Sequence, residues 1–149
     1  MKKVLIALGA VLGAQQAQAQ ILTPVHWSYA AKKTSPTEAV VLIKATIDAG
    51  WHIYSQNVKD GGPVKTTFTF DPSKAYTLVG KTQEPTPTTR MEKTFNMQVS
   101  YFTNSVVFQQ KVKLTAKGPT TVKGKLEFMV CNDEKCLPPD EVAFSIPVK

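Results

Sequence analysis

The sequence predicts an all-β fold, an immunoglobulin-like antiparallel β-sandwich, on the basis of three observations. Apolar and polar residues alternate with period two in several segments, which is the pattern of half-buried strands. Turn-forming Pro, Gly, Asp and Ser residues separate these segments, and no window has a helical period. About seven to nine short strands in one domain of this length are typical of such a sandwich, although strand counting leaves a barrel as the alternative.

The clearest alternation lies in the middle and at the C-terminal end of the chain. Four strands are expected there, at residues 38–48, 106–114, 121–130 and 142–149. Gln110 interrupts the apolar face of the second of these strands. Pro147 predicts an edge position for the last one, because proline cannot donate a hydrogen bond within a sheet. Further strands are expected at residues 25–31, 51–55, 65–70 and 76–79, and residues 84–89 are predicted to form a stiff loop.

The first nineteen residues are expected to be a signal peptide rather than part of the fold. Lys2 and Lys3 precede an apolar segment at residues 4–13, and Ala17-Gln18-Ala19 fits a small-x-small cleavage site. The apolar segment is shorter than a membrane-spanning helix, and an uncleaved anchor is the alternative. The sequence therefore predicts export to the periplasm, with residues 20–149 forming one soluble domain.

Composition and charge make several classes of function improbable. The 149 residues are too few for a large multidomain enzyme. The formal charge is +7, but the basic residues are scattered along an exported chain, so no nucleic acid partner is expected. His26 and His52 have no metal-ligand spacing and form a weak inventory of bases, so neither a metal site nor a hydrolase is expected.

The one motif that carries chemistry is the cysteine pair Cys131 and Cys136, which lies between two predicted strands. Disulfides persist in an oxidising, extracytoplasmic compartment. A disulfide that closes so short a loop stabilises a fold least, which mildly favours redox exchange over stapling. Spacing alone leaves both a structural clip and a redox pair open. Exchange would need an accessible sulfur and a second thiol close enough to resolve a mixed disulfide.

The cysteine pair is followed by Leu137-Pro138-Pro139 and a closing strand, and this arrangement resembles the N-terminal periplasmic domain of DsbD, a transmembrane thiol:disulfide interchange protein. Upstream, residues 48–55 (DAGWHIYS) resemble a family strand near the active site with the pattern Asp-Gly-aromatic-aromatic-apolar-Tyr. Gly61-Gly62-Pro63, Phe68-Thr69-Phe70 and residues 95–102 follow in matching order. The resemblance covers nearly all of residues 20–149 and implies an immunoglobulin-like sandwich, in agreement with the strand pattern.

The resemblance also implies roles for individual residues. Cys136 takes the position of the nucleophile and Cys131 that of its resolving partner. In the family, an aromatic residue on a mobile cap loop shields the disulfide, and Phe95 is the candidate here, with core packing as the alternative. Tyr54 and His52 share one face of a predicted strand and are expected to line the site. The alternatives are an ordinary packing aromatic and a surface histidine.

The chain differs from the best-known members of the family in three respects. Four residues rather than five separate the cysteines. Lys93 and Thr94 stand where those members have acidic residues beside the cap aromatic. The sequence contains neither the membrane domain nor the thioredoxin-like domain, so separate proteins are expected to reduce it.

Two functions follow as expectations. The first is an envelope thiol:disulfide relay, a component of a protein-disulfide reductase system. In it the Cys131/Cys136 pair accepts electrons from a thioredoxin-like partner and reduces periplasmic proteins that carry disulfides. A separate DsbD-type membrane protein is a further candidate partner, and no metal or organic cofactor is needed because the cysteines hold the electrons. The alternative is a non-catalytic envelope binding module with a structural disulfide, whose partner docks on an exposed sheet edge.

Overall fold

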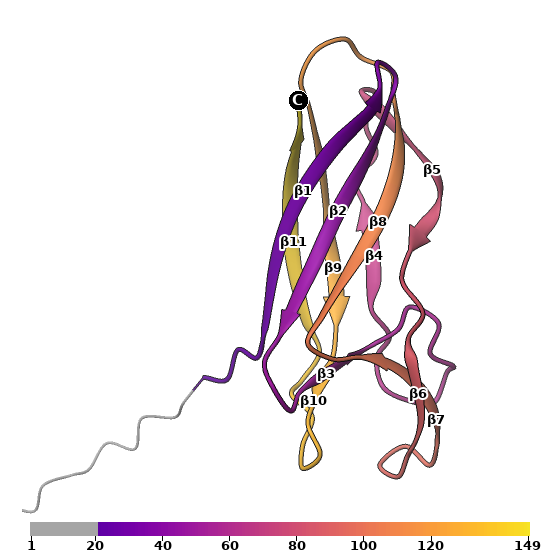
Figure 1. The fold of residues 1–149 in the computed structure, drawn as a ribbon, viewed down its shortest axis with the longest axis vertical. Helices are drawn as coiled ribbons and strands as arrows, with labels where there is room; N and C mark the ends of the chain where they lie inside the picture. Colours follow the sequence, from indigo (N-terminus) through magenta and orange to yellow (C-terminus); the bar gives the residue numbers. More distant parts are fainter. Residues whose placement is uncertain (1–20) are drawn as a thin grey trace, which may run out of the picture.

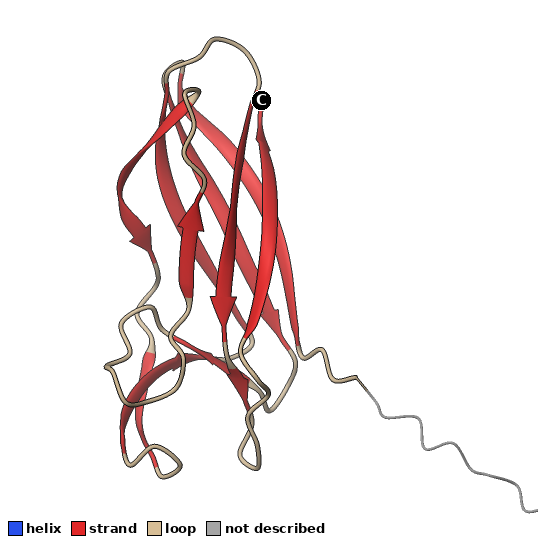
Figure 2. Ribbon diagram, turned by 180° about the vertical axis from the view of Figure 1, so that it is seen from behind, coloured by secondary structure: helices blue, strands red, loops and turns tan. Residues whose placement is uncertain are grey.

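The computed structural model describes residues 21–149, so the predicted signal peptide at residues 1–19 lies outside the described residues. Within the described range the chain forms eleven strands and no helix, as Figures 1 and 2 show. The all-β prediction is therefore confirmed. None of these residues belongs to a helix long and apolar enough to cross a membrane. The strands are β1 (Val25–Ser35), β2 (Glu38–Ile47), β3 (His52–Tyr54), β4 (Thr67–Phe70), β5 (Tyr76–Gln83), β6 (Thr88–Glu92), β7 (Met97–Phe102), β8 (Ser105–Leu114), β9 (Thr120–Phe128), β10 (Val130–Cys131) and β11 (Asp140–Val148).

Two antiparallel sheets pack face to face to form the sandwich. One has the strand order β1-β2-β8-β5 and the other β11-β9-β4. Their inner faces bury alternate residues and meet through aromatic rings, such as Trp27 against Phe128 at 5.3 Å and Tyr29 against Phe144 at 5.9 Å between centroids. The sheets have open edges rather than closing into a barrel, and β11 lies at an edge, as Pro147 predicts. The fold is thus the immunoglobulin-like sandwich that the strand pattern indicates.

Gln110, which breaks the apolar pattern of β8, is buried for a local reason. Its amide nitrogen donates to the carbonyl of Gly80 at 3.2 Å, and its amide oxygen accepts from the Thr82 hydroxyl at 2.8 Å. These partners lie where the pairing of β5 with β8 shifts register between Val79 and Gln83. The buried polar side chain therefore satisfies backbone groups that the irregular strand leaves without a ladder partner.

A third sheet, with the strand order β10-β3-β7-β6 and mostly short strands, is called the small sheet below; it closes one end of the sandwich, the lower end in Figure 1. The stretch predicted as one strand at residues 121–130 is in fact divided at Met129. Strand β9 pairs within the sandwich, whereas β10 pairs with β3. The alternation of side chains continues through this change of sheet. Val130 consequently lies in the main core, and its neighbour Cys131 lies in a second, smaller cluster.

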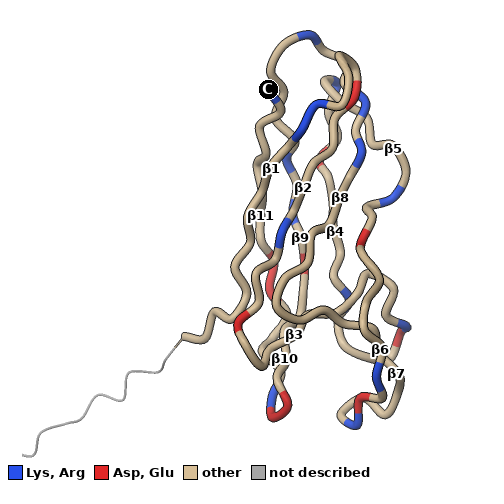
Figure 3. The backbone as a smooth tube through the Cα atoms, viewed as in Figure 1, with Lys and Arg blue, Asp and Glu red and all other residues tan. Residues whose placement is uncertain are grey.

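Strand β6 corrects the loop prediction for residues 84–89. The loop ends one residue before Thr88, because Thr88 and Thr89 pair with Tyr101 and Ser100 of β7. The β6–β7 hairpin and the hairpin that follows β10 both project from the lower end of the molecule (Figure 1). Lys and Arg positions are distributed along the whole sandwich, and both hairpin tips carry charges of both signs (Figure 3).

Candidate redox site

Cys131 and Cys136 face each other across a tight hairpin and are joined by a disulfide, with an S–S distance of 2.04 Å and Cα atoms 4.0 Å apart. Backbone hydrogen bonds flank the pair on both sides: Asn132 N–H to Lys135 C=O at 2.8 Å and Leu137 N–H to Val130 C=O at 2.9 Å. This pattern makes the cysteines a non-hydrogen-bonded pair. That is the position at which facing side chains of antiparallel strands are closest. The local ladder therefore brings the two sulfurs together.

Asn132 fixes the turn between the cysteines. Its side-chain oxygen accepts hydrogen bonds from the backbone N–H groups of Glu134 at 2.9 Å and Lys135 at 2.7 Å. Asn residues stabilise turns in this way, by replacing backbone partners with their own side chain. Four intervening residues are therefore enough to close this hairpin.

The two cysteine residues differ sharply in exposure. Cys131 is 1% exposed and belongs to a small apolar cluster with Tyr54, Val58, Val99 and Met129. Cys136, at the start of the outgoing strand of the hairpin, is exposed. Cys136 is therefore the residue of the pair that faces solvent and a partner protein, whereas Cys131 is shielded.

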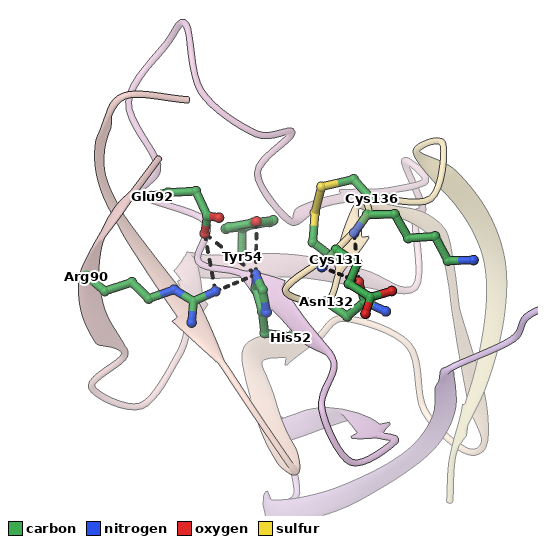
Figure 4. The surroundings of a disulfide bond; sticks show 9 residues. His52, Tyr54, Arg90, Glu92, Cys131, Asn132 and Cys136 are labelled. Carbon is green, nitrogen blue, oxygen red and sulfur yellow. Dashed lines mark hydrogen bonds and ion pairs between the residues drawn. A yellow bond between two sulfur atoms is a disulfide. The ribbon is translucent and has the colours of Figure 1, made fainter. Parts of the chain in front are cut away.

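His52 lies next to Cys131 on the neighbouring strand. The two residues are register partners in β3 and β10, so their side chains lie on the same face of the sheet. His52 is only 3% exposed, and the alternative of a surface histidine is wrong. Its Nε2 atom lies 3.0 Å from the Tyr54 hydroxyl, 3.3 Å from Arg90 Nη2 and 3.9 Å from Glu92 Oε2 (Figure 4).

These contacts determine the protonation state of His52. A guanidinium group can only donate hydrogen bonds, so Nε2 is the acceptor, shared between the Tyr54 hydroxyl and Arg90, and the ring proton is assigned to Nδ1. Burial and then the nearby Arg90 charge lower the pKa of His52, while Glu92 and Asp133 act in the opposite direction with smaller effect. Burial also raises the pKa of Tyr54. At neutral pH the cluster therefore contains a neutral imidazole and a protonated phenol.

The lowered pKa of His52 predicts a loss of stability on acidification. Unfolded histidine takes up its proton near pH 6.5, whereas native His52 resists it. The unfolded state then binds more protons, so the free energy of unfolding falls as the pH drops from about 7.5 to about 5. His52→Gln should flatten this part of the curve, measured by urea unfolding at a series of pH values. The comparison variant is His26→Gln, at an exposed histidine that lies 3.4 Å from Asp48 and outside the small sheet; flattening as large as that of His52→Gln would contradict the assignment to His52.

Arg90 and Glu92 were not among the residues singled out from the sequence. They lie on β6, which has exposed or half-buried residues throughout and gives no apolar alternation. Arg90 is also 38 residues away from His52 in the chain. The only local sign was that the two charges are two residues apart, the spacing that puts them on one face of a strand.

Phe95 lies in the loop between β6 and β7, where Asn96 adopts a positive φ of 51° and turns the chain back. Its side chain is half-buried and packs against the small cluster that contains Cys131 and Tyr54. The structure thus brings together the expected site residues from three separate parts of the sequence: the cysteine pair, His52 with Tyr54, and Phe95.

The loop between β3 and β4 covers the same cluster and is anchored by Glu84, another residue that the sequence did not single out. Val58 and Val64 from this loop pack into the cluster. The Glu84 carboxylate accepts hydrogen bonds from the start of the loop: the Ser55 hydroxyl, the Gln56 N–H at 3.1 Å and the Asn57 side-chain amide at 3.1 Å. Across residues 21–149, His, Cys, Asp and Glu side chains form no group of three able to hold a metal ion.

Comparison with known proteins agrees with this geometry. Residues 18–147 match the family described as thiol:disulfide interchange protein DsbD, N-terminal. Among curated proteins, none matches the sequence. The N-terminal periplasmic domain of ScsB from Proteus mirabilis is similar in structure, with a TM-score of 0.58 and 18% identity over 78% of this chain. The chain spans 43% of the length of that ScsB chain.

Two structures from Neisseria meningitidis are also similar. The reduced DsbD N-terminal domain has a TM-score of 0.51 and 15% identity, covering 79% of this chain and 82% of its own. A complex between the DsbD and PilB N-terminal domains gives a TM-score of 0.55 and 13% identity, covering 85% of this chain and 88% of the other. These likenesses agree in fold. The family match spans almost the entire chain, and the paired sulfurs fit thiol:disulfide exchange, so this protein belongs to the DsbD N-terminal domain family.

Proposed function

We propose that the domain is a thiol:disulfide relay of the periplasm, in which the Cys131–Cys136 disulfide accepts two electrons from one protein and passes them to another. The observation that carries this proposal is the asymmetry of the pair. Cys136 is exposed at a rigid hairpin, and Cys131 is buried directly behind it. A structural clip would not require one of its sulfurs to be open to attack.

The reaction has two exchange steps in each direction. A thiolate of the donor attacks the sulfur of Cys136, a bond between the two proteins forms, and the Cys131–Cys136 bond breaks. The electron pair goes to the sulfur of Cys131, which takes up a proton. A second donor thiolate then attacks the donor's own sulfur in the mixed disulfide, so the donor leaves as a disulfide and the domain as a dithiol. The same steps in reverse reduce the acceptor.

The donor is a thioredoxin-like protein in this proposal, and the acceptor is a periplasmic protein with a disulfide. Support for a protein partner comes from the similar fold in the complex of the DsbD and PilB N-terminal domains. A separate DsbD-type membrane protein would supply the electrons upstream. Residues 1–19 would act as the signal peptide that delivers the domain to the periplasm, consistent with their basic and apolar pattern.

The remaining site residues control access in this proposal. Phe95 is the cap that shields the disulfide from small thiols, supported by its packing on the cluster that contains Cys131. His52 and Tyr54 line the site beneath the cap, and their hydrogen bond at 3.0 Å keeps both rings in place.

The experiment that tests the relay is a measurement of reduction potential. The domain is equilibrated in graded thiol buffers, and the thiols are counted by alkylation and mass spectrometry. We expect a value between roughly −120 and −270 mV, the range of proteins that exchange disulfides. A value below roughly −300 mV is typical of structural disulfides and would overturn the relay in favour of a binding module.

A further inference from the structure

Arg90 links the edge of the small sheet to the strand beside Cys131. Its guanidinium group lies 4.6 Å above the centre of the Tyr101 ring on β7. It also reaches His52 Nε2 on β3 at 3.3 Å (Figure 4). Glu92, two residues further along β6, holds the same nitrogen of Arg90 at 3.3 Å. One side chain therefore spans from β6 over β7 to β3.

The backbone holds the outer part of this hairpin only weakly. Strand β7 pairs with β3 at two positions, Ile53 with Phe102 and Tyr54 with Tyr101. One more backbone bond joins Ser55 to Ser100 at 2.9 Å. Between Arg90 and the tip, the hairpin therefore has its own ladder but no hydrogen-bonded neighbour strand. Phe95 sits at this tip, so side chains must fix its position over the small cluster.

We propose that Arg90 is a positioning residue of the redox site: it braces the β6–β7 hairpin against His52 and Tyr101, and so keeps Phe95 seated on the cluster that contains Cys131 and limits the access of small thiols to the disulfide. This inference rests on the proposed function. Arg90 touches neither a sulfur nor a substrate in this proposal and acts through the cap alone.

The brace depends on a neutral His52. An imidazolium carries a proton on Nε2, cannot accept from Arg90 and repels its charge. The charged and titratable groups that face His52 are Arg90 and Glu92 from β6, Tyr54 from β3, Tyr101 from β7 and Asp133 from the cysteine hairpin. Of these, Arg90 opposes the protonation of His52, and Glu92 and Asp133 favour it. Acidification is therefore expected to loosen the cap.

The test measures the rate at which dithiothreitol reduces the disulfide at fixed pH. We expect Arg90→Gln to raise the rate about two- to fivefold, as loss of one partly exposed cation–π contact would. Arg90→Lys keeps the charge and should give a smaller rise. Lys125→Gln is the matched control, because it removes one cation from an exposed ion pair on β9, remote from the small sheet. Thermal melts check that each variant is folded. If Arg90→Gln does not fold, Arg90→Lys serves as the test variant.

A double-variant cycle separates positioning from a direct electrostatic effect on sulfur. In a Phe95→Ala background there is no cap left to position, so Arg90→Gln should add nothing to the rate. The ratio of the wild-type rate to the Phe95→Ala rate should also rise as the pH falls towards about 5, and His52→Gln should remove this dependence. An equal effect of Arg90→Gln with and without Phe95, or no effect while Phe95→Ala raises the rate, would overturn the brace but leave the relay standing. A reduction potential in the range typical of structural disulfides would instead overturn the relay itself.

Discussion

Replacing Cys136 with Ser is expected to abolish electron transfer completely, whereas replacing Cys131 with Ala should trap a covalent complex. The physical reason is the difference in exposure between the two sulfurs. Without Cys136 the only remaining thiol is 1% exposed and unreachable. Without Cys131 the exposed thiol still attacks a partner disulfide, but no second thiol resolves the mixed disulfide.

The two variants control for each other, because each removes the same disulfide and so the same contribution to stability. Cys131→Ala also truncates a buried side chain, so thermal melts of both variants are needed to separate folding from the position of the remaining sulfur. The measurement is capture of a thioredoxin-like protein, followed on non-reducing gels and by mass spectrometry. Equal trapping by both variants would contradict the assigned roles. Loss of stability alone, with neither variant trapping a partner, would favour a binding module.

Most strands of the sandwich were predictable because one face of each is more buried than the other, whereas β5 has only its first residue buried. Val41, Ile43 and Ala45 of β2 alternate with half-buried or exposed residues, and this period survives in the sequence. Strand β6 was not predictable in this way, because its one apolar side chain, Met91, is exposed and the strand has no apolar alternation. The change of sheet at Met129 was equally hidden. The same alternation runs through β9 and β10, and a pattern of faces does not say which sheet a strand joins.

The sequence identified the chemistry of the site better than its surroundings. The cysteine pair, His52, Tyr54 and Phe95 all converge on the small sheet. Arg90 and Glu84 could not be found, because Arg90 is 38 residues from His52 and Glu84 is 27 to 29 residues from its partners Ser55, Gln56 and Asn57. Glu92 was hidden for the same reason, because its place in the site depends on strand pairing between β6 and β7. The exposure of Cys136 and the burial of Cys131 also follow from tertiary packing, since Val58, Val99 and Met129 come from three different segments.

Phe95→Ala is expected to speed reduction of the disulfide by small thiols such as dithiothreitol about five- to tenfold. A half-buried phenyl ring contributes roughly 1 kcal/mol by its burial, and a tenfold change in rate corresponds to about 1.4 kcal/mol. Removing the ring lowers the free energy needed to open the cap by about the contribution of its burial, so small thiols reach the disulfide more often. Phe95→Leu, which keeps an apolar side chain, should retain most of the protection.

The matched control is Phe70→Ala, because Phe70 is also half-buried but packs against Phe144 in the main core. It should lower stability and leave the rate with small thiols unchanged. Reduction by a thioredoxin-like protein should respond less to Phe95→Ala, because a docking partner displaces the cap with its own surface. The loss of selectivity between protein and small thiols is therefore the signature of a cap. An unchanged rate with dithiothreitol would mean that Phe95 only packs, and that the turn at residues 132–135 and the burial of Cys131 alone control access to the disulfide.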